Sequence, residues 1–214
     1  YRKRNTGDEM KFSDHYCRSL SESFFPINEA YDIGRNLFHT IETFLDGWFV
    51  TSPHDAGILA QLIRNTGHGD HLEIGTAWGG SAILAALVKR YYGLSGKVVC
   101  VDPVTGHDTV LNRDRSEESI RDNFKRFYVD PELIIEPFSL SSVEDRRFAS
   151  VLIDGDHREE VARENWMDVK QIADKYVMVH DYDKVHQGIV TAIDDKSGFS
   201  IVHISGGSIV LEKE

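Results

Sequence analysis

Short apolar runs alternate with segments in which apolar residues recur every three or four positions, from about residue 71 to the end of the chain. The runs predict buried strands, and the helical spacing predicts helices that cover them. Strands are expected at the run that ends in Gly75 and at residues 97–101, 133–135, 148–153 and 176–179. Helices are expected at residues 82–88, 120–127, 161–172 and 189–193. Two further runs, 199–204 and 208–211, flank Ser205-Gly206-Gly207 and predict a closing antiparallel hairpin.

This order of elements predicts an α/β fold, a Rossmann-like doubly wound sheet of seven strands with a C-terminal antiparallel hairpin. Before the first strand, apolar residues fall at helical spacing within residues 24–50, and Ser52-Pro53 has the form of a helix cap followed by a first-turn proline. We expect this N-terminal helical extension either to cover a ligand cleft or to form a homodimer contact. Residues 1–20 are polar and are expected to be loosely ordered.

The composition narrows the classes of function. The 214 residues carry a formal net charge of −11, and the only basic cluster is Arg2-Lys3-Arg4, so nucleic acid is not an expected partner. No apolar stretch approaches the ~20 residues of a membrane span, and no signal peptide is visible. Cys17 and Cys100 are too few for a disulfide framework, so a reducing, cytoplasmic setting is expected. The chain begins with Tyr1 rather than Met, so its natural start is expected to lie upstream.

A glycine-rich turn follows the first expected strand. The segment from Glu73 through Gly75 and Gly79 to Ser81 reads as strand, turn and helix start, and Asp102 ends the next strand about twenty residues later. This layout places a nucleotide-like ligand against backbone amides at a helix N-terminus, with the acid accepting hydrogen bonds from a ribose. The alternative is a structural turn whose glycines only permit close packing.

Acidic groups also end the later strands. Asp154 follows the strand at 148–153, and His180-Asp181 follows the strand at 176–179. Because parallel strands end at one edge of a sheet, these carboxylates should meet there and could bind a divalent cation such as Mg²⁺. The alternative is that both aspartates cap the helices that follow. His157, three residues after Asp154, is a candidate general base; the alternative is a purely local hydrogen bond.

These motifs, in this order, resemble the class I S-adenosylmethionine-dependent methyltransferases. The subgroup that the chain resembles comprises the macrocin-, mycinamicin- and novobiocin-type O-methyltransferases and the cephalosporin-hydroxylase-like proteins. The resemblance rests on residues 73–81, Asp102, Ile153-Asp-Gly-Asp-His157 and His180-Asp-Tyr182. It covers residues 52–214 as the methyltransferase domain, and leaves residues 1–51 as a tail and helical cover of a single globular unit.

The resemblance implies a role for each matched position. The residues implied to bind S-adenosylmethionine are Glu73, Gly75, Gly79, Ser81, Asp102, Phe138, Ser139 and Asp154. Within this set, Asp102 would hold the ribose, while Phe138 and Ser139 would lie beside the adenine. Asp154, His180 and Asp181 match metal-ligand positions. His157 and Asp154 match the catalytic positions, with His157 as the base.

The implied reaction is transfer of a methyl group to a hydroxyl of a small sugar or phenolic acceptor, with Mg²⁺ as a possible second cofactor that holds the acceptor oxygen. The chain departs from the family pattern in three places. Arg158-Glu159 stands where a tyrosine is usual, Ala173-Asp-Lys175 replaces a glycine pair, and His180 replaces an acid. Two alternatives therefore stay open: a non-catalytic cofactor-binding module, and a nicotinamide-dependent oxidoreductase on a similar sheet.

Overall fold

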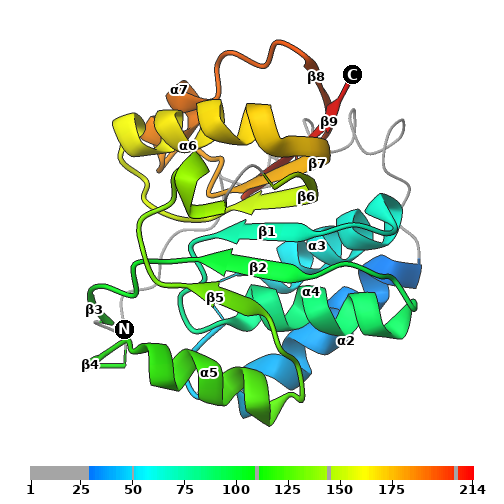
Figure 1. Ribbon diagram of the computed structural model, residues 1–214, viewed down its shortest axis with the longest axis vertical. Coiled ribbons are helices and arrows are strands. Elements are labelled where there is room, and N and C mark those ends of the chain that lie inside the picture. The colour runs from blue at the N-terminus through cyan, green and yellow to red at the C-terminus, as the bar shows by residue number, and fades with distance from the viewer. Residues whose placement is uncertain (1–28, 50, 109–110, 144–145, 205–206) are drawn as a thin grey trace, which may run out of the picture.

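The computed structural model describes residues 29–49, 51–108, 111–143, 146–204 and 207–214. Seven strands form one sheet in the spatial order β5-β2-β1-β6-β7-β9-β8 (Figure 1). In chain order they are β1 (His71–Ile74), β2 (Val98–Val101), β5 (Glu132–Ile134), β6 (Phe148–Ile153), β7 (Ala173–His180), β8 (Phe199–Ile204) and β9 (Ser208–Lys213).

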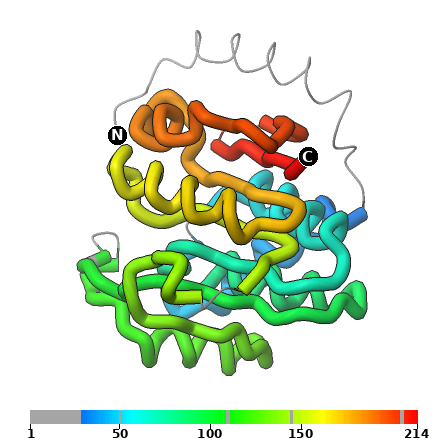
Figure 2. The backbone as a smooth tube through the Cα atoms, turned by 45° about the horizontal axis from the view of Figure 1, so that its top comes forward, coloured from blue at the N-terminus to red at the C-terminus, as the bar shows by residue number. Residues whose placement is uncertain are grey.

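Neighbouring strands from β5 to β7 pair in parallel, and β9 runs antiparallel to both β7 and β8. Figure 2 shows the C-terminal hairpin, in red, at one end of the sheet and the green segment that holds β5 at the other. The expected α/β fold, with a doubly wound seven-stranded sheet and a C-terminal antiparallel hairpin, is confirmed. Residues 205–206 of the hairpin turn lie outside the described residues.

Helices cover both faces of the sheet. One apolar cluster joins α2 (Glu29–Phe44), α3 (Pro53–Thr66), α4 (Gly80–Tyr91) and α5 (Glu117–Arg126) to one face. A second joins η1 (Leu140–Val143), α6 (Glu159–Ile172) and α7 (Gln187–Ala192) to the other. Successive strand residues alternate between the two clusters, as the period of two requires: Val98 and Cys100 pack on the first, Val99 and Val101 on the second.

The N-terminal helical region matches its expected pattern. Pro53 opens α3, and the Ser52 hydroxyl accepts a hydrogen bond from the Asp55 backbone N–H at 3.1 Å. The helix expected within residues 24–50 is α2, which packs against α3 and α4. The division of the chain at residue 51 stays a prediction, and the expectation for residues 1–20 lies outside the described residues.

Two elements differ from the expected pattern. The polar segment 103–118, for which the sequence pattern predicts neither strand nor helix, contains a small antiparallel ribbon of β3 (His107–Asp108) and β4 (Arg113–Asp114), and α5 begins within it at Glu117. Strand β7 begins at Ala173, three residues before the expected strand, because that stretch continues the pairing with β6. Among the helices that the structure describes, none has the length and apolar character needed to cross a membrane.

Candidate functional site

The carboxyl ends of β1, β2, β6 and β7 lie side by side because these strands are parallel and adjacent (Figure 1). A cavity of about 660 Å³ opens along this edge. Its wall includes Gly75, Asp102, Phe138, Asp154 and Asn165, which come from four different strand ends and from α6. This volume lies within the roughly 300–1,000 Å³ range of small-molecule sites. The edge is therefore concave and large enough for a ligand of nucleotide size.

Two glycines shape the turn between β1 and α4. Gly75 has φ +83°, and a Cβ added there would lie 2.3 Å from the Asp154 carbonyl oxygen. The β1 and β6 ends are held this close because the Asp154 N–H donates to the Ile74 carbonyl at 2.9 Å. Gly79 has φ +88° and precedes the first residue of α4, in a left-handed conformation that favours glycine. The turn thus requires glycine at both positions whatever ligand it holds.

Asp102 lies directly after β2, and its carboxylate binds backbone amides of the glycine turn between β1 and α4. Its Oδ2 accepts the backbone N–H groups of Thr76 at 2.8 Å and Ala77 at 3.1 Å, and its Oδ1 accepts the Val104 N–H at 2.6 Å. The sequence suggested a ribose contact but did not indicate this bracing of the turn. A carboxylate has about four acceptor positions, so a ribose hydroxyl can still bind beside the three amides. Asp102 also lines the large cavity, and its contact with a ligand stays a prediction.

Glu73 is completely buried within β1. The Thr76 hydroxyl donates to its Oε1 at 2.6 Å, while Oε2 has no hydrogen-bond partner among the described residues. Burial raises the pKa of Glu73 to about 8. Glu73 lines neither the large cavity nor the smaller hollow described below, so it supports the turn through Thr76, and its contact with the methionine part of a cofactor stays a prediction.

The two residues expected beside an adenine differ in position. Phe138, which follows β5, lines the large cavity. Ser139 does not, because its hydroxyl is engaged with the hydroxyls of Ser141 at 2.8 Å and Ser142 at 3.1 Å at the start of η1. Among the adenine-side expectations, only Phe138 therefore has a side chain in the cavity wall.

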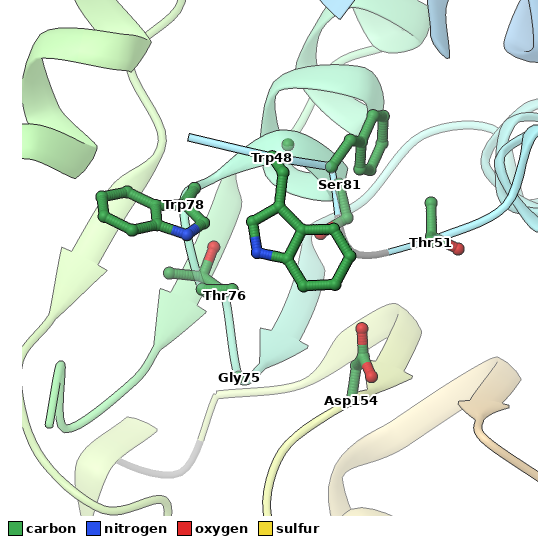
Figure 3. A pocket seen from close by; sticks show the side chains of 10 residues that line it. Trp48, Thr51, Gly75, Thr76, Trp78, Ser81 and Asp154 are labelled. Carbon is green, nitrogen blue, oxygen red and sulfur yellow. The ribbon is translucent and has the colours of Figure 1, made fainter. Parts of the chain in front are cut away.

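A smaller hollow of about 20 Å³ shares Gly75, Ala77 and Asp154 with the wall of the large cavity and is also lined by Ser81. Trp48, from the segment after α2, forms part of its wall, and Figure 3 shows its ring beside that of Trp78, with Asp154 across from it. Both indole N–H groups donate to Asp108 Oδ2, Trp48 at 2.9 Å and Trp78 at 2.8 Å. Sequence reasoning missed Trp48 and Asp108, because no motif marks either residue.

A buried acid–histidine cluster occupies the β7 end of the edge. His180 Nδ1 lies 3.3 Å from both Asp154 Oδ1 and Asp181 Oδ2. On the opposite side of the ring, Nε2 lies 3.0 Å from the Thr51 hydroxyl and 3.8 Å from Asp55 Oδ2. Although burial disfavours the charged ring, these three carboxylates raise the pKa of His180 to about 12. The cluster therefore contains its own cation.

Asp55 is a part of this cluster that sequence reasoning missed, since its position three residues after the Ser52 cap reads as an ordinary first-turn acid. Its carboxylate is buried and accepts hydrogen bonds from the Ser52 hydroxyl and, at 2.7 Å, from the Ser208 hydroxyl in β9. Burial works against its charge, but His180 and these hydroxyls lower the pKa of Asp55 to about 2. The carboxylate thus joins α3 to β7, through His180, and to β9, through Ser208.

The three residues expected to bind Mg²⁺ do lie together, since one ligand atom of each falls within 4.8 Å of the others. The imidazole of His180, however, stands between Asp154 and Asp181 and already balances their charge. Mg²⁺ prefers an octahedral shell of oxygen and water, whereas the central donor here is a nitrogen that would first have to lose its proton. Asp154, His180 and Asp181 in this arrangement do not fit Mg²⁺, and metal binding by them stays a prediction that their charges disfavour.

His157 lies on the open side of the same cluster. Its Nε2 is 3.0 Å from Asp181 Oδ2, and 41% of its side chain is exposed. The hydrogen bond to Asp181 outweighs partial burial and raises the pKa of His157. The ring is not in the wall of the large cavity, although its neighbours Asp156 and Arg158 are. The structure therefore brings the expected base to Asp181, at the solvent-facing margin of the site.

No protein-family model matches the sequence, and a search of curated proteins finds no match. Solved structures do match. The O-methyltransferase NovP aligns over 86% of this chain and 97% of its own, with TM-score 0.66 and 17% identity. The fold is that of a class I S-adenosylmethionine-dependent methyltransferase. An O-methyltransferase from Bacillus cereus, solved with SAH, aligns over 94% of this chain and 97% of its own, with TM-score 0.57 and 17% identity.

The O-methyltransferase TomG from Streptomyces achromogenes, solved with SAM, aligns over 95% of this chain and 99% of its own, with TM-score 0.52 and 14% identity. At these identities the methyltransferase fold is shared, and the chemistry of this chain has to be argued from its own residues.

Proposed function

We propose that the protein transfers a methyl group from S-adenosylmethionine to a hydroxyl of a small sugar or phenolic acceptor. The observation that carries this proposal is the cavity of about 660 Å³ at the carboxyl edge, which extends from Asp102 and Phe138 to Asp154, beside the His157–Asp181 pair. A cofactor-sized space and a candidate base thus lie at one edge of the sheet. The net charge of −11 supports a small-molecule acceptor rather than nucleic acid.

The described residues fit S-adenosylmethionine. Gly75 and Asp102 both line the cavity, and Asp102 keeps acceptor capacity for a ribose. Phe138 offers an apolar wall for an adenine. Helix α4 begins at Gly80 without a side-chain cap among the described residues, so its first backbone amides can bind the carboxylate of the cofactor. Once bound, the cofactor would supply an electrophilic methyl group, and the protein's main contribution would be to align the acceptor oxygen with it.

The chain's own contribution to the chemistry is removal of a proton. Asp181 accepts a hydrogen bond from His157 Nε2, which leaves Nδ1 to take the proton of the acceptor hydroxyl. Asp181 then stabilises the imidazolium that forms. His180 fixes both Asp181 and Asp154 from the buried side. Because His180 already provides a positive charge, we propose that transfer does not depend on Mg²⁺.

The test is methyl transfer from labelled S-adenosylmethionine to a panel of hydroxylated acceptors, paired with calorimetry of cofactor binding. His157→Gln should lower kcat by about 10²–10⁴-fold and leave cofactor affinity unchanged. His39→Asn, at an exposed position of α2, is the matched control and should change neither. Cofactor binding with no transfer to any acceptor would support a non-catalytic binding module, and absence of binding would remove the proposal altogether.

A further inference from the structure

A second constellation of ligand-type side chains lies on the exposed side of Asp181. One ligand atom each from His157, Asp181 and His186 falls within 4.8 Å of the others. His157 Nε2 lies 3.0 Å from Asp181 Oδ2, and His186 Nδ1 lies 3.9 Å from Asp181 Oδ1. The two imidazole rings contact each other edge to face, with centroids 4.6 Å apart. Two imidazoles and one carboxylate therefore converge on a single small space.

The donor types favour a borderline transition metal over Mg²⁺. Imidazole nitrogen suits Zn²⁺ and neighbouring divalent ions of the first transition series, and two histidines with one carboxylate leave a coordination position open. With metal–ligand bonds of about 2.0–2.1 Å, tetrahedral geometry separates neighbouring donor atoms by about 3.3 Å. The distances of 3.0 Å and 3.9 Å, which run to the two different oxygens of Asp181, lie on either side of that value, so small rotations of the three side chains would accommodate an ion.

The local backbone holds these three groups in place. Asp181 has φ +54°, a left-handed conformation that is uncommon outside glycine, at the end of β7. Asp183 Oδ1 accepts a hydrogen bond from the His186 backbone N–H at 3.0 Å, which fixes the backbone of this residue. The same oxygen lies 3.1 Å from His186 Nδ1, and a metal ion bound to that nitrogen would replace this contact, as it would replace the contact of His157 with Asp181. The side chains of His157, His186 and Asp181 are 41%, 29% and 23% exposed, so an ion can reach them from solvent.

We propose that His157, Asp181 and His186 form a binding site for a divalent transition metal ion of the Zn²⁺ type, and that occupancy stops methyl transfer. The second half rests on the proposed function. An ion bound to Nε2 of His157 replaces the hydrogen bond to Asp181, and the remaining ring proton then resides on Nδ1. The ring has no lone pair left to accept the proton of an acceptor hydroxyl. The same histidine would thus serve either as base or as metal ligand.

Binding is tested first, without reference to activity. Metal-free protein is titrated with Co²⁺ and followed by the visible absorption of the tetrahedral ion, and with Zn²⁺ by calorimetry. We expect one site, and a loss of affinity of at least about tenfold in His186→Asn, because a ligand is removed. His39→Asn, which changes an exposed histidine on α2, is the matched control and should bind as the unaltered protein does. Equal affinity in His186→Asn and the unaltered protein would overturn the metal site.

Inhibition is tested second, with S-adenosylmethionine and an accepted hydroxylated substrate. Zn²⁺ should abolish transfer in the unaltered protein and in His39→Asn, and a chelator should restore it. Relative to its own turnover without metal, His186→Asn should require at least about tenfold more Zn²⁺ for half-inhibition. Metal binding without inhibition would overturn the regulatory half alone. If His186→Asn were inhibited at the same Zn²⁺ concentration as the unaltered protein, the inhibitory ion would bind elsewhere, and the regulatory half of the proposal would again be overturned. An absence of turnover in every variant would instead contradict the proposed function and leave the binding result standing.

Discussion

Gly75 and Gly67 offer a matched pair of substitutions that separates backbone strain from steric overlap. Both residues have positive φ angles, +83° at Gly75 and +78° at Gly67. A Cβ at Gly67 meets nothing within 4 Å, whereas a Cβ at Gly75 would lie 2.3 Å from the Asp154 carbonyl oxygen. Alanine at either position destabilises the folded state by about 1–3 kcal/mol, because its backbone must adopt a positive φ. Only Gly75→Ala must also separate the ends of β1 and β6.

The size of the additional effect follows from the overlap. To reach ordinary van der Waals contact, the Asp154 carbonyl or the turn has to move by about 1 Å, and a displacement of that size at a reacting centre costs on the order of 10²-fold in rate. We therefore expect Gly67→Ala to lower the free energy of unfolding by about 1–3 kcal/mol with unchanged turnover. Gly75→Ala should lower it further and reduce both cofactor affinity and kcat.

The assay combines urea unfolding with calorimetry of S-adenosylmethionine binding and methyl transfer to an accepted substrate. Comparison of the two alanine variants removes the strain that they share. If Gly75→Ala were no less stable than Gly67→Ala and bound the cofactor with unchanged affinity, the close approach of β1 and β6 would not be what shapes the site, and the reasoning would be refuted.

Three further outcomes are expected. Asp102→Asn should lower the melting temperature and weaken cofactor binding by about 10–100-fold, since hydrogen bonds to a charged acceptor contribute about 1.5–3 kcal/mol. The control is Asp130→Asn, at an exposed loop position, and calorimetry should show unchanged cofactor binding in this variant. Transfer should persist within about twofold after treatment with a chelator, because a tenfold change would require ~1.4 kcal/mol of metal contribution; a larger loss restored by Mg²⁺ would contradict the role given to His180. Burial lowers the pKa of His71 to about 3 in the folded protein, against 6.5 in the unfolded chain. Below pH 6.5 the unfolded chain therefore binds a proton at this ring that the folded protein does not bind, and the free energy of unfolding falls as the pH drops. That loss of stability reaches about 2 kcal/mol at roughly pH 5. Urea unfolding of His71→Gln at neutral and acid pH should show that this loss has disappeared. The same pH dependence in the variant as in the unaltered protein would contradict the role of His71.

The sheet was accessible from sequence because its strands are short apolar runs bounded by turn residues, and their alternation with helical patterns leaves few topologies. The ribbon of β3 and β4 was not, since its residues are polar and carry no period of two. The ribbon is held in place by residues that are distant in the sequence. Asp108 accepts hydrogen bonds from Trp48 and Trp78, and Arg113 lies 4.4 Å from the Trp78 ring centre and 2.7 Å from Asp46. Contacts between separated segments leave no local signal.

The site shows the same division. The positions of Gly75, Asp102 and Asp154 at one edge follow from parallel strands, which sequence pattern predicts well. The charge of His180 does not, because it depends on Asp55 arriving from α3, more than a hundred residues earlier in the chain. Three carboxylates around one ring convert an expected neutral ligand into a cation, and only the assembled structure shows all three.

The shared carboxylate of Asp108 also gives the site an optical signature. The chain has 3 tryptophans, and two of them, Trp48 and Trp78, donate to that one oxygen beside the smaller hollow. The third, Trp166, is buried against Phe199 of β8 in the apolar cluster on the other face of the sheet. The intrinsic fluorescence of the protein therefore has a static component and a component that senses this hollow. A ligand that enters it or shifts the β3–β4 ribbon would change the emission without any label, so that occupancy can be followed in real time.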